Sequence, residues 1–391
     1  MNKIILVLIS LLMLNSSFAQ KGKVVSALNF KEAGKLEQAF KTIQTTIDKN
    51  NEKSAKSINW PRTWEVRGEI YQAVFHSKDE KIKALSTDPL TEALNSYKRA
   101  LELDTKNKFS KSVKIKLTLL NNDFQDQAVE AYNLENYSKA LVSFEQILEI
   151  NNLPLFKTDN LMSIDTAIIY NAGMMALKTD DSDKAVRYFR EAARHGYNGA
   201  TTYLWLSRAY EQKKDTINAS ESLKQGFEKY PENNELLSNM IQLYLNMDRK
   251  EEAMHFLELA ISREPDKAVY YLAMGNLLDK NHDNENAIIS YEKAIELDTD
   301  LFMGYFNLGV IYYNEGVQLF ESAKNIPSDD SASYEKVIKE VDKYWEKSLP
   351  FMEKCYELNP EDAATVESIK SLYYRLNQMD KYNAIQKNST K

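Results

Sequence analysis

The stretches YLWLSRAYEQKKDTINASESLKQGFEKYP (residues 203–231) and LSNMIQLYLNMDRKEEAMHFLELAISREP (residues 237–265) follow one pattern at an interval of 34 positions. At the same interval stand Ala185, Ala219, Ala253 and Ala287. Twelve residues before these alanines stand Gly173, Ser207, Ile241 and Gly275. A 34-residue period with small side chains at fixed offsets is typical of a helix–turn–helix unit whose helices pack too closely for bulky groups. The period therefore predicts an all-α chain of stacked helix pairs.

These positions resemble the tetratricopeptide repeat (TPR) family. Its pattern places an aromatic residue or Leu four positions before the small residue, Tyr three positions after it and Pro twenty-four positions after it. The fifth repeat matches with Tyr203, Ser207, Tyr210, Ala219, Leu223, Gly226 and Pro231. The resemblance covers nearly all of residues 20–391. It implies a right-handed α-solenoid of about eight to nine repeats.

Interruptions divide this array. The regular repeats run over residues 166–301, and insertions are predicted near residues 74–88, 108–120, 155–165 and 314–343. The last insertion lengthens both helices of the eighth repeat, so a projecting hairpin is expected, with Ser331 as the cap of its second helix. Two interpretations of this hairpin stay open: a docking element, or an insertion that packs on itself.

The N-terminus has the order of a secretory signal peptide. Lys3 precedes an apolar run over residues 4–14, and Ser17-Phe18-Ala19 is a cleavage pattern before Gln20. Residues 1–19 are therefore expected to be removed, which predicts a periplasmic or secreted protein. No later apolar run is long enough to span a bilayer. The formal net charge of −7 argues against a nucleic-acid binder, because such proteins neutralise phosphates.

The search for chemistry finds no catalytic, cofactor or metal site. The four histidines have no metal-ligand spacing, and phosphate-binding and nucleophile-elbow motifs are absent from the sequence. The acidic run at residues 180–183 lacks the spacing of a calcium loop, and Ser182 or Asp183 is expected to cap a helix. Cys355 falls at a small buried position of the repeat, which favours a structural role. The sequence therefore predicts a protein that is not an enzyme.

The TPR resemblance implies that the first helix of each repeat lines a concave groove that binds protein or peptide partners. The predicted groove residues are Tyr170, Met174, Leu204, Arg208, Gln242, Leu272, Asn276 and Phe306. The alternative is that these side chains pack between adjacent first helices. A separate basic stretch over residues 106–116 is either a site for an acidic partner, anionic lipid or glycan, or a solvated helix face.

Together these features predict an extracytoplasmic scaffold that binds another protein, in envelope assembly or secretion. The alternative is a glycan- or peptide-binding accessory protein of nutrient uptake, which would favour clustered exposed aromatic residues over amides in the groove.

Overall fold

The computed structural model describes residues 21–50, 54–157 and 165–388, and within these ranges the regular elements are helices, with no β-strand. The predicted signal peptide at residues 1–19 lies outside the described residues. The fold is an all-α helical repeat solenoid, as the 34-residue period predicts. By its internal contacts the chain divides into two compact units, Met1–Asp215 and Thr216–Lys391, so the division falls within the fifth repeat.

Unit 1 begins with a helix over residues 21–32. It continues with α2 (Leu36–Thr45), α3 (Ala55–Ile58), α4 (Pro61–Phe75), α5 (Glu80–Lys83), α6 (Pro89–Leu103), α7 (Ser110–Asn133), α8 (Tyr137–Asn151), α9 (Pro154–Lys157), α10 (Thr166–Lys178), α11 (Ser182–Arg194) and α12 (Ala200–Gln212). The pairs α4 and α6, α7 and α8, and α10 and α11 pack against each other, and α10 also contacts α8. Within this unit each helix pair therefore stacks on its neighbour in chain order.

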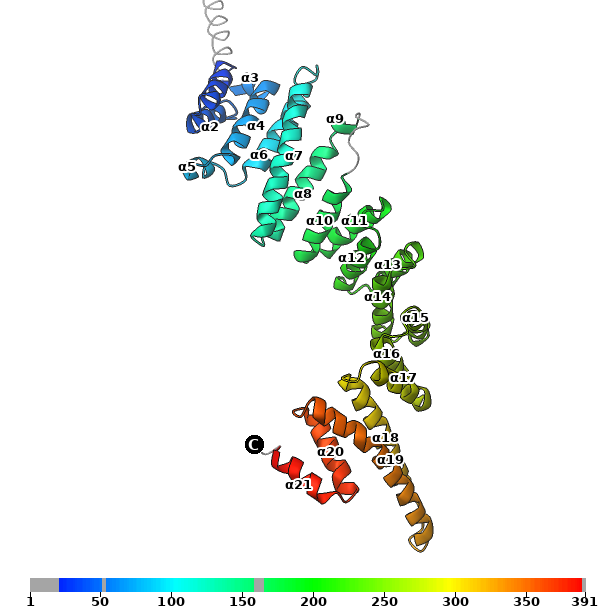
Figure 1. Cartoon of the computed structure of the whole chain (residues 1–391). Coiled ribbons are helices and arrows are strands. Elements are labelled where there is room, and N and C mark those ends of the chain that lie inside the picture. Colours follow the sequence, from blue (N-terminus) through cyan, green and yellow to red (C-terminus); the bar gives the residue numbers. More distant parts are fainter. Residues whose placement is uncertain (1–20, 51–53, 158–164, 389–391) are drawn as a thin grey trace, which may run out of the picture. The chain divides into compact units, whose positions relative to one another are not determined.

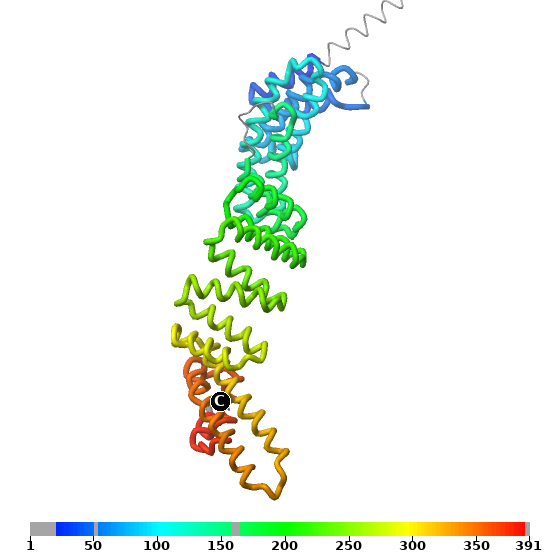
Figure 2. The backbone as a smooth tube through the Cα atoms, turned by 90° about the vertical axis from the view of Figure 1, so that its right-hand side faces the viewer, coloured from blue at the N-terminus to red at the C-terminus, as the bar shows by residue number. Residues whose placement is uncertain are grey.

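Unit 2 has the same plan. It contains α13 (Thr216–Lys229), α14 (Asn234–Asn246), α15 (Lys250–Arg263), α16 (Ala268–Lys280), α17 (Asn284–Leu297), α18 (Phe302–Ala323), α19 (Ser331–Leu358), α20 (Ala363–Arg375) and α21 (Met379–Asn388). The pairs α14 and α15, α16 and α17, and α18 and α19 are in contact, and their helices follow one another along the unit (Figure 2). The core is therefore distributed along the array, as expected for nearest-neighbour packing.

The small residue of each repeat faces a large side chain on the second helix. A Cβ built on Gly275 would lie 2.5 Å from the ring of Tyr291, and one built on Gly173 would lie 3.0 Å from the ring of Phe189. Gly68 is in the same position against Tyr97. Real Cβ atoms essentially never come as close as 2.5 Å to another heavy atom, so the glycine is what allows the two helices to approach. The periodic alanines 185, 219, 253 and 287 are fully buried.

The turn between the two helices of a repeat also recurs at 34 residues. Asp180, Lys214, Asp248 and His282 all have a left-handed backbone conformation, with φ between 56° and 62°. In each turn the next amide closes a hydrogen bond back onto the helix, as from Asp181 N to the Ala176 carbonyl at 2.9 Å. None of these four residues is glycine, whereas Gly34 occupies the same turn of the first repeat with a φ of 73°, so backbone geometry rather than residue type is what repeats.

The long eighth repeat packs on itself. Gly309 faces Met352, and one heptad further out on both helices Gly316 faces Trp345, whose Nε1 would lie 2.5 Å from an added Cβ. Val341, Trp345 and Leu349 share one buried cluster with residues of α20 and α21. The α18–α19 hairpin thus continues the small-against-large packing of the repeats. Its cap is Asp330, which accepts a hydrogen bond from Ser333 N at 3.1 Å, so the prediction of Ser331 was wrong by one residue.

Candidate partner-binding grooves

The predicted groove residues lie four in each unit, so each unit has its own candidate groove. In unit 1, two adjoining cavities follow the helices α7, α10 and α12. The cavity between α7 and α10 has a volume of about 350 Å³, and the one between α10 and α12 about 650 Å³. Met174 and Lys178 line both cavities, so the two cavities form one continuous surface. We call it the first groove; its named side chains are Val129, Tyr132, Met174, Lys178, Trp205 and Arg208.

The structure separates the four predicted residues of this unit. Met174 and Arg208 line the first groove, with Arg208 exposed. Tyr170 lines its α7 side but is half-buried, with its ring 5.5 Å from that of Phe189 and 5.3 Å from that of Tyr197. Burial raises the pKa of the Tyr170 hydroxyl. Leu204 is half-buried and lines neither cavity. Tyr170 therefore serves packing as much as binding.

The first groove carries two cations without carboxylate partners. Within the described ranges, neither Lys178 nor Arg208 forms an ion pair. Instead, Lys178 Nζ lies 4.5 Å from the ring centre of Tyr137, and Arg208 Cζ lies 6.0 Å from that of Trp205. Cations held against ring faces keep their charge available to an incoming anion. Glu211 also lines the α12 side, so the lining carries two cations and one carboxylate. The surface therefore has an excess of positive charge, which favours a negatively charged group beside apolar contacts.

Several residues of the first groove were not among the predicted ones. Val129 is 59% exposed and Tyr132 is 48% exposed, although both are large and apolar. Met174 was predicted because it directly follows Gly173, the small residue of the fourth repeat. Val129 directly follows Ala128, the small residue of the third repeat, so the same criterion predicts Val129 as well. About one helical turn further lie Tyr132, three residues after Val129, and Lys178, four residues after Met174. A longer stripe along each first helix would have included them.

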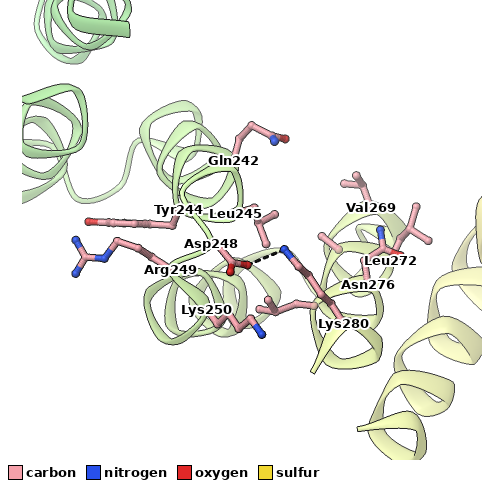
Figure 3. A pocket seen from close by; sticks show the side chains of 12 residues that line it. Gln242, Tyr244, Leu245, Asp248, Arg249, Lys250, Val269, Leu272, Asn276 and Lys280 are labelled. Atoms are coloured by element: carbon pink, nitrogen blue, oxygen red, sulfur yellow. Dashed lines mark hydrogen bonds and ion pairs between the residues drawn. The ribbon is translucent and has the colours of Figure 1, made fainter. Parts of the chain in front are cut away.

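The second groove, in unit 2, lies between α14 and α16 with a volume of about 390 Å³ (Figure 3). It brings together the predicted Gln242, Leu272 and Asn276. Lys280 reaches across it to Asp248, Nζ to Oδ1 at 2.6 Å, so the charges at this end compensate each other. The Asn276 Oδ1 accepts hydrogen bonds from the Tyr291 hydroxyl and from Asn307 Nδ2, both at 2.8 Å. Val269, which sequence reasoning missed, adds an exposed apolar side chain.

Phe306, the eighth predicted residue, lines neither cavity. It is half-buried on α18, its ring centre 5.9 Å from that of Phe302, and it packs against the cluster formed by α19, α20 and α21. For Phe306 the structure thus shows the packing alternative.

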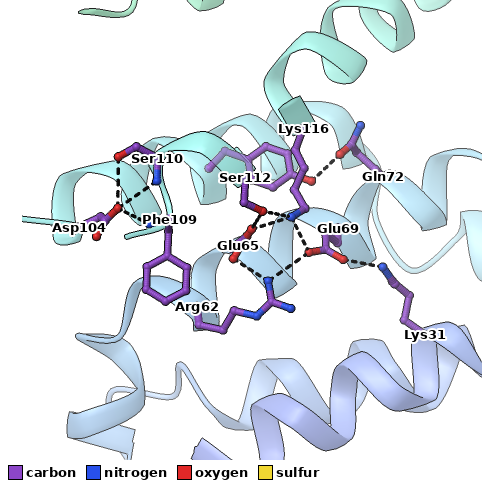
Figure 4. Close-up of polar contacts among 11 residues, drawn as sticks. Lys31, Arg62, Glu65, Glu69, Gln72, Asp104, Phe109, Ser110, Ser112 and Lys116 are labelled. Carbon is purple, nitrogen blue, oxygen red and sulfur yellow. Dashed lines mark hydrogen bonds and ion pairs between the residues drawn. The ribbon is translucent and has the colours of Figure 1, made fainter. Parts of the chain in front are cut away.

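In unit 1, the face shared by α4 and α7 is filled by an ion-pair network (Figure 4). Glu65 is fully buried; it pairs with Arg62 at 2.6 Å and with Lys116 at 2.6 Å, and accepts a hydrogen bond from Ser112. Glu69 joins it through Lys116 at 3.1 Å and Lys31 at 2.5 Å. The interpretation of residues 106–116 as a wholly solvated face is wrong for Lys116, since its partners lie about fifty residues earlier in the chain.

This network predicts a stability that depends on acid. Burial alone raises the pKa of Glu65, but hydrogen bonds from Lys116, Ser112 and Arg62 outweigh it and hold the pKa below its usual range. A lowered folded-state pKa gives stability that is present above the unfolded pKa and is lost as pH falls through the folded one. Lys116→Met should lower the free energy of unfolding by about 2 kcal/mol at pH 7. In this variant the melting temperature should also fall less steeply between about pH 5 and pH 3 than in the unchanged protein.

The matched control for this experiment is Lys111→Met, which removes an exposed lysine from the same helix. Its melting temperature should follow that of the unchanged protein at each pH. Identical pH profiles for Lys116→Met and Lys111→Met would show that the network contributes no acid-sensitive stability.

The remaining candidates for chemistry are structural. Asp181, rather than the predicted Ser182 or Asp183, caps α11 by accepting from Lys184 N at 3.1 Å. Cys355 is buried, and this burial raises its pKa to about 12, which keeps the thiol protonated. Among the described residues no cluster of three or more His, Cys, Asp or Glu could hold a metal ion. In the same residues, no helix combines the length and apolarity needed to cross a membrane.

Comparison with known proteins fits this geometry. Family models described as "TPR repeat" and "Tetratricopeptide repeat" match residues 275–316 and 212–277. The chain is 26% identical over 208 residues to BBSome complex member BBS4 of Bos taurus, covering 53% of this chain and 38% of that protein. It is 25% identical over 167 residues to TPR repeat-containing protein MJ1428 of Methanocaldococcus jannaschii, covering 38% of this chain and 29% of that protein. The chain thus spans less than two fifths of either relative.

Similar solved structures include a TPR repeats protein (BF2334) from Bacteroides fragilis, 20% identical, covering 65% of this chain and 98% of that one, with a TM-score of 0.32. Another is YrrB, a TPR protein with an unusual peptide-binding site, 18% identical, covering 50% of this chain and 95% of that one, with a TM-score of 0.38. The segments matched by the family models lie where helix pairs recur every 34 residues; the chain is a tetratricopeptide repeat protein.

Proposed function

We propose that this chain is a non-enzymatic scaffold that holds an extended, acidic and apolar segment of a partner protein in the first groove. TPR proteins mediate protein–protein interaction and peptide binding. The observation that carries the proposal is the combination of exposed Val129 and Tyr132 with the unpaired cations Lys178 and Arg208 on three consecutive first helices. Exposed apolar side chains that converge with cations are typical of a binding surface.

The shape of the first groove suits an extended segment. Its two cavities adjoin at Met174 and Lys178, so a chain lying across α7, α10 and α12 passes both. Alternate side chains of an extended peptide point to opposite sides, so one set can enter the cavities while the other stays in solvent. A carboxylate next to an apolar side chain would then meet Lys178 or Arg208.

The second groove is the weaker candidate for such a segment. Three cations line it, and two of them are already paired, Lys280 with Asp248 and Arg249 with Glu252, which leaves Lys250. Asn276 already accepts two hydrogen bonds. An acidic partner would have to displace the Asp248 carboxylate. The first groove needs no such exchange, and we therefore assign the principal contact to it.

The place of action belongs to the same proposal. The sequence of residues 1–19 supports export, and with it a role outside the cytoplasm, in envelope assembly or secretion. The intact mass of the protein purified from its native host tests this, since export with cleavage leaves Gln20 as the first residue. A retained Met1 on the purified protein would contradict it.

Selection of displayed random peptides against the whole protein tests the groove. The expected outcome is enrichment of sequences that combine Asp or Glu with Leu, Phe or Tyr. The enriched peptides should compete with one another, because they share the first groove. Enrichment of basic sequences, or peptides that keep binding when Val129 and Tyr132 are both changed to serine, would contradict the proposal.

A further inference from the structure

A second exposed surface lies at the N-terminal end of α7 and in the turn before it. Lys106, Lys108 and Lys111 are exposed, and none of them forms an ion pair with any residue that the structure describes. Ile115 is 65% exposed and Leu119 is 54% exposed on the same helix. We call these five residues the lysine–apolar face.

Helical geometry places the members in α7 together. Lys111, Ile115 and Leu119 are spaced by four residues, which puts them on one side of a helix. The neighbouring sides are occupied: Ser112 and Lys116 point to Glu65 (Figure 4), and Lys114 Nζ lies 5.4 Å from the ring centre of Phe156. Among the described residues, this stripe stays exposed while the sides of the helix next to it contact α4 and α9.

Carboxylates close to this face are engaged elsewhere. Asp104 is buried, and its oxygens accept hydrogen bonds from the backbone amides of Lys108, Phe109 and Ser110. Glu102 pairs with Arg99, and Glu149 pairs with Lys98. The first exposed carboxylate further along α7 is Asp126, roughly 22 Å beyond Lys111 at 1.5 Å per residue. The face is thus locally cationic in a chain whose net charge is −7.

We propose that the lysine–apolar face docks on the surface of an anionic lipid bilayer. Lysines near such a surface are attracted by its negative potential, and exposed aliphatic side chains beside them enter the headgroup boundary. None of the cavities described above is lined by these five residues. A bilayer needs no cavity, whereas a peptide partner finds one in the first groove. The inference does not depend on the proposed function, because it uses different residues.

Flotation of the whole protein with lipid vesicles tests this. Wild type should float with phosphatidylcholine vesicles that contain about one third phosphatidylglycerol and not with phosphatidylcholine alone. Raising salt from about 0.05 M to about 0.5 M should weaken binding. The variant Lys106→Glu, Lys108→Glu, Lys111→Glu should lose binding by about tenfold or more. Ile115→Ser with Leu119→Ser should lose it by about threefold or more.

The matched control is Lys224→Glu, Lys336→Glu, Lys339→Glu, which changes the net charge equally at three exposed lysines of unit 2. It should float like wild type. Equal losses in both triple variants would overturn the proposal, because net charge alone would then explain the effect. Wild type that binds polyglutamate but ignores the anionic vesicles would also overturn it and assign the face to an acidic polypeptide.

Discussion

Replacing Gly275 with leucine should lower the free energy of unfolding of unit 2 by about 3 kcal/mol, at the upper end of the usual cost of overpacking. An added Cβ lies 2.5 Å from Tyr291 Cε1 before the rest of the side chain is placed. Tyr291 has little room to move, because it is fully buried and its hydroxyl donates to Asn276 at 2.8 Å. The measurement is urea denaturation, monitored by the circular dichroism of helices at about 222 nm.

Two companion variants locate the cause. Glu258→Leu introduces the same side chain at an exposed position of α15 and should change the stability by less than about 0.5 kcal/mol. Gly275→Ala should fall between them, because its Cβ already meets the ring while alanine favours the helix by about 1 kcal/mol. If Gly275→Leu and Glu258→Leu unfold at the same urea concentration, then α16 and α17 do not approach each other as closely as in the structure.

Reversing both cations of the first groove should nearly abolish capture of the acidic peptides selected on this protein. Lys178→Glu with Arg208→Glu removes two charge-assisted contacts and adds repulsion, which we expect to raise Kd by about 100-fold or more. Both side chains are exposed, so the melting temperature should stay unchanged. Fluorescence anisotropy with a labelled selected peptide measures the Kd, and the loss should shrink as salt increases.

The control for this pair is Lys224→Glu with Lys336→Glu, which makes the same charge change at exposed sites in unit 2. It should bind the peptide within about twofold of wild type, because neither lysine lines the first groove and salt screens exposed charges. Lys280→Glu distinguishes the two grooves, because Lys280 belongs to the second one. If Lys280→Glu abolishes capture and Lys178→Glu with Arg208→Glu does not, the assignment to the first groove is wrong.

The helix pairs and their register could be predicted from the sequence because they depend on contacts between residues close in the chain. Gly173 faces Phe189 sixteen residues later, and Gly275 faces Tyr291 at the same distance. Such a contact must recur in every repeat, so it leaves a period that can be counted. The helix N-caps were predicted less exactly. The N-caps are Asp181 and Asp330, one residue before the predicted Ser182 and Ser331. Both candidates in each pair can cap, and backbone geometry selects between them.

Which of the predicted side chains are accessible in a groove depends on tertiary structure. Tyr170 and Phe306 occupy equivalent positions in their repeats, but neighbouring rings enclose the first and the cluster of α19, α20 and α21 contacts the second. In the sequence Lys116 belongs to a basic run that is expected to be exposed, but in the structure it forms ion pairs with Glu65 and Glu69 of α4.

By itself, the sequence determined an all-helical repeat protein, the register of its helix pairs and the small residues at their contacts. Only the tertiary structure decided which polar and apolar side chains remain free. The physical reason is that close packing within a pair is local and periodic. The exposure and charge pairing of a groove residue instead depend on other helices, from repeats separated by insertions of unequal length.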